Sequence, residues 1–352
     1  MKFDYCIGNP AYNADFTNSG DNGNYAAPVY NDFLDAAYEV SNKVEMIHPA
    51  RFLFNAGSTP KKWNSKMLND EHFKVLKYEP NSSNVFSNTD IMGGIAISYH
   101  DNNKNFGKIE VFTPYDELNS LLKKVKPMTD KGTFDSIITG RGVYKLSKLA
   151  LEEYPEIESI QSKGHKFDVG SGAFKILKDC IFFENKPETN EEYVRFLGLS
   201  NSKRAYFWAE EKYQNVPDSF YHYKVFIPQA NGSRALGEAG ATPLIGEPVI
   251  GLPHEGATET FLSIGCFETE QEAKACLKYI KGKFARSMLG ILKITQANTR
   301  DKWKYVPLQN FTSNSDIDWS KSIPEIDQQL YRKYGLSEEE INFIETNVKE
   351  MN

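Results

Sequence analysis

Residues 4–12 read Asp-Tyr-Cys-Ile-Gly-Asn-Pro-Ala-Tyr and bring together groups able to handle an aromatic amine. The nitrogen of a conjugated exocyclic amine is planar and a poor nucleophile, because its lone pair is delocalised into the ring. The side-chain oxygen of Asn9 and the carbonyl of Pro10 could accept its two hydrogens and favour a tetrahedral nitrogen, whose lone pair can then take a methyl group. Pro10 helps because its φ is fixed and it lacks a donor. Tyr12 would stack on the base, which must leave a duplex to be reached.

The elements around this motif predict an α/β sheet. Residues 2–8 are typical of a short strand and deliver the Asn-Pro pair to its carboxyl end, where open α/β folds bind their ligands. Helical spacing of apolar residues follows Pro28, and Thr59-Pro60 is a typical helix start. Further strands are predicted at residues 44–47, 73–78, 95–99 and 108–113. Short strands separated by helices predict a mostly parallel sheet covered on both faces.

The pattern changes near Lys131, after a predicted helix around Leu118. Strands are then predicted at residues 173–183, 193–197, 221–227 and 260–264, with a glycine-rich loop at 231–248. A long amphipathic helix is expected from residue 268 to 289, and Ser337 with Glu340 forms a capping-box start for a last helix. We therefore expect three parts, at residues 1–115, 116–315 and 316–352.

Several blocks resemble, in order, the motifs of the amino-methyltransferases of restriction-modification systems. Their fourth motif reads Asn/Asp-Pro-Pro-Tyr/Phe after an apolar strand, which residues 9–12 nearly match. Pro-Val-Tyr-Asn-Asp-Phe at 28–33 looks like the fifth motif, and Ile-His-Pro-Ala-Arg-Phe-Leu at 47–53 like the block that follows. Asn-Ser-Ser-Asn-Val-Phe at 81–86, with the Gly-Gly pair at 93–94 after it, looks like the eighth motif. Residues 303–308 and 330–337 also look like type II adenine-specific enzymes, so the resemblance covers nearly the whole chain.

This resemblance implies a fold and a reaction. The implied fold is α/β, with the later half of a class I (Rossmann-like) methyltransferase sheet in residues 1–115. A mixed α/β DNA target-recognition domain at 116–315 and an acidic helical tail at 316–352 follow. The implied reaction is methyl transfer from S-adenosylmethionine to adenine N6 in a specific sequence of double-stranded DNA. Asn9 and Pro10 would orient the amine, and Tyr12 and Phe86 would stack on the two faces of the flipped adenine.

Two departures from the family pattern alter these expectations. Ala11 stands where the family has its second proline, which predicts a less rigid loop that keeps both acceptors. In this motif order the donor-binding segments precede the Asn-Pro loop, and only eight residues do so here. We therefore expect the segment that binds S-adenosylmethionine to be absent from this chain, its binding residues to be unknown, and the strand at 2–8 to keep an unpaired edge. A donor-binding half or a restriction subunit would then be a separate partner.

The distribution of charge predicts where DNA would bind. The formal net charge is −6, but residues 316–352 hold nine acids and four bases, and the rest is close to neutral. Between Lys278 and Lys304 eight bases accompany one acid, Asp301. Such a run is commonly the solvated face of a helix, but in a recognition domain it also predicts phosphate contacts. The candidate DNA-binding residues are Lys278, Lys281, Lys283, Arg286, Lys293 and Arg300.

Two other motifs are weaker candidates for a functional site, one for donor binding and one for a nuclease. Asp168-Val-Gly-Ser-Gly172 resembles a glycine-rich donor motif, but a polar stretch precedes it and a predicted strand, not a helix, follows. Glu184-Asn-Lys186 could join Asp168 or Asp179 in a nuclease set, a pattern that arises easily by chance. The six histidines show no ligand spacing and the four cysteines no CxxC pairing, so we expect neither a metal nor disulfides.

Two alternative interpretations stay open. The chain could be a non-catalytic DNA-specificity module or fragment that binds DNA or a partner subunit. The loop could also methylate RNA or a protein glutamine, since both kinds of enzyme use Asn-Pro-Pro-Tyr loops; the large second region speaks against small protein-methylating enzymes. No signal peptide opens the chain and no apolar run is long enough to cross a bilayer, so a cytoplasmic location without a membrane partner is expected.

Overall fold

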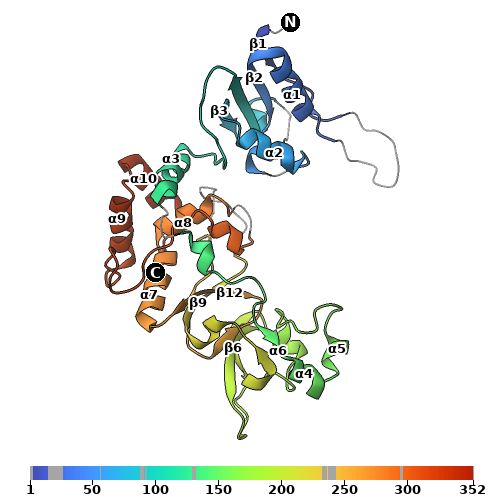
Figure 1. Cartoon of the computed structure of the whole chain (residues 1–352), viewed down its shortest axis with the longest axis vertical. Helices are drawn as coiled ribbons and strands as arrows, with labels where there is room; N and C mark the ends of the chain where they lie inside the picture. Colours follow the sequence, from blue (N-terminus) through green and yellow to red (C-terminus); the bar gives the residue numbers. More distant parts are fainter. Residues whose placement is uncertain are drawn as a thin grey trace. The chain divides into compact units, whose positions relative to one another are not determined.

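The computed structural model describes residues 3–14, 27–55, 57–87, 91, 93–128, 132–231, 236, 243–293 and 296–351. It divides the chain into two compact units, Met1–Asp116 and Glu117–Asn352 (Figure 1). The first unit holds the Asn-Pro loop, and the second holds the region expected to recognise DNA.

The first unit is built on a four-stranded sheet in the order β1-β2-β4-β3. Its strands are β1 (Phe3–Gly8), β2 (Ser41–Pro49), β3 (Phe73–Glu79) and β4 (Ile95–Asp101). β1 and β2 run parallel, whereas β4 is antiparallel to both β2 and β3. The prediction of a mostly parallel sheet is therefore wrong for the described strands. A parallel pair needs a long crossover, usually a helix, and the described part of the β3–β4 connection contains only a short 3-10 turn, η2 (Ser82–Asn84).

Two helices, α1 (Tyr30–Val40) and α2 (Lys61–Leu68), pack against this sheet. Leu34 and Ala37 of α1 and Trp63 and Met67 of α2 recur at helical spacing and are buried. They share one apolar cluster with the strand residues Val44, Met46, Phe73 and Ala96. Burial of each large apolar side chain contributes about 1.5–3 kcal/mol, so this cluster is what holds the loops of the unit in place.

Strand β1 lies at the edge of the described sheet. It pairs with β2 alone among the strands that the structure describes. Its residues Phe3, Tyr5 and Ile7 are 59%, 60% and 75% exposed, so this face of the strand carries apolar side chains in contact with solvent.

The segment at residues 108–113, predicted as a strand, is irregular. Gly107 and Glu110 have positive φ values of 78° and 55°, which a strand cannot accommodate. The amide of Val111 donates to the carbonyl of Ile109 at 2.6 Å and closes a three-residue turn. Apolar residues of this segment pack on the core of the first unit, which explains the apolar pattern without a strand.

The second unit contains three small sheets in its described part. Strand β6 (Tyr193–Ser200) pairs antiparallel with β7 (Lys203–Glu210) and parallel with β11 (Glu255–Ala257). Strand β9 (Tyr223–Pro228) lies between β10 (Val249–Gly251) and β12 (Phe261–Phe267), antiparallel to both. The third sheet joins β5 (Lys145–Leu146) and β8 (Gln214–Asn215). The strands predicted near residues 193, 221 and 260 are confirmed.

The helices of the second unit are α3 (Asp116–Val125), α4 (Lys148–Glu153), α5 (Ile157–Ile160), α6 (Ala173–Ile176), α7 (Glu270–Lys281), α8 (Lys283–Gly290), α9 (Ile323–Lys333) and α10 (Glu338–Asn347). The predicted strand at 173–183 is wrong, since α6 and a turn through Asp179 (φ 62°) occupy it. The predicted single helix at 268–289 is broken at Gly282, where a Cβ would come within 2.7 Å of a carboxylate oxygen of Asp327. The capping box at Ser337 is confirmed. No described helix has the length and apolar character needed to cross a membrane.

Candidate active site and DNA interface

Three loops of the first unit start from one edge of its sheet. β1 and β2 run parallel, and β3 runs in the same direction because it and β2 are both antiparallel to β4. The carboxyl ends of these strands therefore share an edge, with Asn9 after β1, Arg51 after β2 and Phe86 after β3. β1 and β3 are the outer strands, about 14 Å apart at three strand spacings. Their loops must cover that separation before Tyr12 and Phe86 can hold the same base.

Asn9 and Pro10 follow the last residue of β1 directly. Gly8 lies close against β2, and a Cβ at this position would come within 3.2 Å of the sulfur of Met46. The Asn9 side chain is exposed and Pro10 is half-buried. The predicted acceptor groups thus lie at the surface of the first unit, where a base from outside can reach them.

Tyr12 is half-buried and packs against the core of the first unit. Its carbonyl accepts a hydrogen bond from the amide of Val29 at 3.1 Å, and the next residue, Asn13, forms a bridge with Pro28. Its hydroxyl is buried, and no described residue hydrogen-bonds to it. Burial raises the pKa of Tyr12 above its usual value, so the phenol stays neutral near pH 7.

Phe86 is half-buried and follows the turn η2. Its amide donates to the carbonyl of Ser82 at 2.9 Å. The loop is braced by its own polar side chains: Asn81 accepts from the hydroxyl of Ser83 at 2.7 Å, and Ser82 accepts from the amide of Ile91 at 2.8 Å. The Asn/Ser-rich composition of this block therefore stiffens the backbone that carries Phe86.

Arg51 is a residue of this edge to which the sequence analysis assigned no role. Cβ atoms built on Gly57 and Gly93 would come within 3.1 and 2.5 Å of its side chain, and both glycines have positive φ. At Gly94 a Cβ would lie 2.4 Å from the carbonyl oxygen of Glu79. The glycine pair at 93–94 was the signal for this close packing, because Gly93 leaves room for the Arg51 side chain and Gly94 for the carbonyl of Glu79.

His48 lies under the same edge and is fully buried. Its Nε2 is 2.8 Å from the hydroxyl of Ser98, its Nδ1 is 3.1 Å from the carbonyl of Pro49, and its ring stacks on Tyr30 with 6.0 Å between centroids. Burial lowers the pKa of His48 to about 4, so the imidazole is neutral near pH 7. Its role is to support β2 and α1 rather than to exchange protons.

The basic residues predicted to face DNA do not form one exposed stripe, because three of the six are buried. DNA contact by Lys278, Lys283 and Arg300 stays a prediction. Arg286 and Lys293 are 0% exposed and Lys281 is 7% exposed. Burial lowers the pKa of Arg286 to about 10 and that of Lys293 to about 8. Lys281 pairs with Glu247 at 2.7 Å, and Lys293 donates to the carbonyl of Asn231 at 3.2 Å.

Arg286 holds the backbone of three segments together. Its Nε donates to the carbonyls of Lys281 and Gly282 at 3.0 and 3.2 Å, and its Nη1 to those of Pro243 and Lys349 at 3.1 and 2.5 Å. Carbonyls at helix ends and in loops lack partners of their own, and a buried guanidinium satisfies several at once. A cavity of about 340 Å³ beside it is lined by Lys281, Lys283 and Arg286 and by the acids Asp327, Glu345 and Glu350. The buried Asp327 and the exposed Glu345 and Glu350 thus lie close to these bases.

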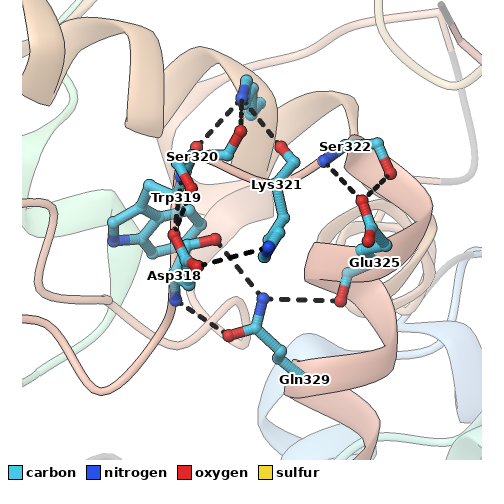
Figure 2. A network of polar contacts seen from close by, with 8 residues as sticks. Asp318, Trp319, Ser320, Lys321, Ser322, Glu325 and Gln329 are labelled. Carbon is cyan, nitrogen blue, oxygen red and sulfur yellow. Dashed lines mark hydrogen bonds and ion pairs between the residues drawn. The ribbon is translucent and has the colours of Figure 1, made fainter.

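Lys278, Lys283 and Arg300 also have internal partners. Lys278 donates to the carbonyls of Trp319 and Lys321 at 2.9 and 2.8 Å. The loop that supplies them is braced by Asp318, Ser320 and Gln329, as Figure 2 shows. Lys283 pairs with Glu345 at 2.6 Å, and Arg300, which stays exposed, donates to the carbonyl of Asp135 at 2.8 Å.

The two weaker motifs have structural explanations. Asp168 pairs with Lys145 at 2.5 Å and His165 at 2.7 Å, and Val169 is buried in the core of the second unit. Glu184 lies 3.6 Å from Lys178, while the ammonium of Lys186 lies over the ring of Trp208. Among the described residues, no group of three or more His, Cys, Asp or Glu side chains could hold a metal ion.

Comparison with known proteins gives one family match. The family model of the Eco57I restriction-modification methylases matches residues 1–86. Among solved structures, the chain is similar to the type IIG restriction endonuclease BpuSI, with 11% identity and a TM-score of 0.33. The alignment covers 91% of this chain and 48% of that one, so the chain spans about half of that enzyme's length. A likeness at this level defines neither fold nor function. No curated protein matches the chain.

Proposed function

We propose that this chain carries the catalytic loop and the DNA-recognition part of a restriction-modification methyltransferase that modifies adenine N6 in double-stranded DNA. The match of residues 1–86 to the Eco57I restriction-modification methylases supports a methyltransferase-related role. The observation that carries the finer proposal is the exposed Asn9, followed by the half-buried Pro10, directly after β1 and at the edge where β2 and β3 also end.

Asn9 and Pro10 would act on the adenine amine. The Asn9 side-chain oxygen and the Pro10 carbonyl accept its two hydrogens, which draws the nitrogen toward tetrahedral geometry and localises its lone pair. The nitrogen forms the new bond to the methyl carbon, the bond between that carbon and the donor sulfur breaks, and one amine proton is lost to solvent. Tyr12 and Phe86 hold the flipped base by stacking on its faces, which contributes about 1–3 kcal/mol per base.

S-adenosylmethionine, the proposed donor, supplies an electrophilic methyl group. No described residue is assigned to its binding. The glycines at 170 and 172 do not fit, because Asp168 is engaged by Lys145 and His165 and Val169 is in the core. We propose that the donor is bound by a separate half, on another segment or chain, in a cytoplasmic protein that also works with a restriction activity.

Methylation of duplex DNA by the protein, with its donor-binding half present, tests this function. We expect labelled methyl groups in DNA, and mass spectrometry of the digested nucleosides should identify N6-methyladenine. Methyl groups found only on cytosine, RNA or protein would overturn the adenine assignment. Specific DNA binding without methyl transfer would favour the alternative of a non-catalytic specificity module.

A further inference from the structure

The hairpin formed by β6 and β7 has one buried face and one partly exposed face. The side chains of its buried face are Val194, Phe196, Phe207 and Ala209. Because side chains alternate along a strand, Arg195, Tyr206 and Trp208 lie on the other face, where they are half-buried. Leu197, on the same face, is buried. Figure 1 shows this hairpin extending from the body of the second unit.

The partly exposed face alternates cations and aromatic rings. The ammonium of Lys186 lies 5.4 Å from the centre of the Trp208 ring. The guanidinium of Arg195, on the same face of the hairpin, lies 5.9 Å from the centre of the Trp208 ring and 4.9 Å from the centre of the Tyr206 ring. The buried carboxylate of Glu255 pairs with Arg195, and the backbone of Trp208 exchanges two hydrogen bonds of 2.8 Å with Phe183. These contacts hold the face rigid before any partner binds.

The tip of the hairpin is polar and positively charged. Asn201 and Ser202 have positive φ values of 49° and 62°, as the two central residues of a type I′ turn require. The next residues, Lys203 and Arg204, are exposed. The guanidinium of Arg204 lies 5.5 Å from the centre of the Phe261 ring and donates one hydrogen bond to the carbonyl of Glu247. The hairpin contains three bases and one acid, Glu210, at the end remote from the tip. In a chain of net charge −6 this is a locally cationic projection.

We propose that this hairpin is the element of the second unit that enters the major groove of double-stranded DNA, with Lys186, Lys203 and Arg204 on phosphates. The inference rests on the proposed function and names the surface that serves it. β11 pairs with β6 only as far as Leu197, so beyond that residue β6 and β7 form a two-stranded ribbon. Such a ribbon fits the major groove, which is about 12 Å wide. The occupant is a polyanion because the exposed cations Lys203 and Arg204 occupy the tip and residues 193–209 contain no acid; the exposed acids Glu184, Glu188, Glu191 and Glu192 precede the hairpin in the chain. The rigid Arg195–Trp208 face supports the ribbon in the groove.

Equilibrium binding of the full chain to labelled duplex DNA over a series of KCl concentrations tests the proposal. The variant Lys186→Ala, Lys203→Ala, Arg204→Ala should bind more weakly at every sequence. Its log–log salt slope should fall by up to about 2.7, since each phosphate contact contributes about 0.9. The matched control is Lys163→Ala, Lys166→Ala, Lys274→Ala, which removes the same charge from exposed lysines on other elements and should keep the slope. Circular dichroism should show both variants folded, because all six side chains are exposed or partly exposed.

The outcomes separate the hairpin from the catalytic proposal. Wild-type affinity and slope in the hairpin variant, or no DNA binding by the unaltered chain, overturns the hairpin proposal. An equal loss in the control variant also overturns it, because net charge alone would then explain the effect. If DNA binding depends on the hairpin but the protein transfers no methyl group, the hairpin proposal is supported and the proposed function is contradicted.

Discussion

The carbonyl oxygen of Tyr12 accepts a hydrogen bond from the backbone amide of Val29, with 3.1 Å between the two atoms. Val29 immediately precedes helix α1, whose residues Leu34 and Ala37 are buried in the core of the first unit. The end of the Asn-Pro loop is therefore anchored by backbone on a packed helix, while the Asn9 side chain stays exposed. This arrangement separates the residues expected to do chemistry from those that hold the loop, and variants can test each group.

We expect Asn9→Ala to lower methyl transfer while leaving DNA affinity nearly unchanged. The Asn9 oxygen would act on the amine as its charge develops, and loss of one such preorganised partner costs about 10²–10³-fold in turnover. Single-turnover methylation together with equilibrium DNA binding measures the two effects separately. Asn13→Ala, which changes an exposed asparagine of the same loop, is the control and should keep its activity. Full activity of Asn9→Ala would remove the mechanism proposed for this loop.

We expect Tyr12→Phe and Tyr12→Ala to behave differently. The Tyr12 hydroxyl is buried without a hydrogen-bond partner among the described residues, and such a group costs about 1–3 kcal/mol. Tyr12→Phe should therefore keep methylation and match or exceed the wild-type free energy of unfolding in urea. Tyr12→Ala should lose turnover and affinity for DNA with an extrahelical base, because the stacking face is gone. If Tyr12→Phe is as inactive as Tyr12→Ala, the hydroxyl has a chemical role that stacking does not explain.

Arg286→Met should destabilise the second unit by about 3 kcal/mol or more. The substitution leaves the carbonyls of Lys281, Pro243 and Lys349 without the donor that the guanidinium supplies, and each buried unsatisfied group costs about 1–3 kcal/mol. The carbonyl of Gly282 keeps the hydrogen bond from the backbone amide of residue 286. Arg286→Lys should recover little of the lost free energy of unfolding, because an ammonium cannot reproduce the planar fork of the guanidinium. Urea denaturation measures the change, with exposed Arg300→Ala as the control. If the Arg286→Met variant instead has wild-type stability but its DNA affinity depends less on salt, Arg286 contacts DNA.

The first unit should lose stability as the pH falls from 6.5 toward 4. The pKa of buried His48 is about 4 in the fold, below its ordinary value of 6.5, so the unfolded chain takes up the proton first. The contribution of neutral His48 is complete above pH 6.5 and is lost on acidification, by about 3 kcal/mol at most. Hydrogen exchange of the α1 and β2 amides as a function of pH measures this loss. His48→Gln should flatten the dependence; an equally steep loss in that variant would assign it to other groups.

The local sequence pattern was sufficient to predict several helices and strands of the first unit. The apolar run before Asn9 forms β1, the spacing after Pro28 forms α1, and the block around Ile97 forms β4. The Ser337 capping box also starts a helix as predicted. These elements are decided by hydrogen bonds and side-chain periodicity within a few residues, which the sequence displays directly. The roles of Asn9, Pro10, Tyr12 and Phe86 stay predictions, because the separation of their loops depends on contacts across the sheet.

The sequence by itself determined that an Asn-Pro-x-Tyr loop follows a strand and that a cluster of bases lies between Lys278 and Lys304. Only the tertiary structure decided strand direction in the sheet and the partners of those bases. A basic side chain has the same identity in the sequence whether it faces a phosphate or a carbonyl. The sequence therefore predicted Arg286 and Lys293 to be surface residues, whereas the structure buries both against loop backbone. The cations of the β6–β7 hairpin are fewer and scattered in sequence, and strand pairing alone brings Arg195 beside Trp208 and leaves Lys203 exposed at the tip.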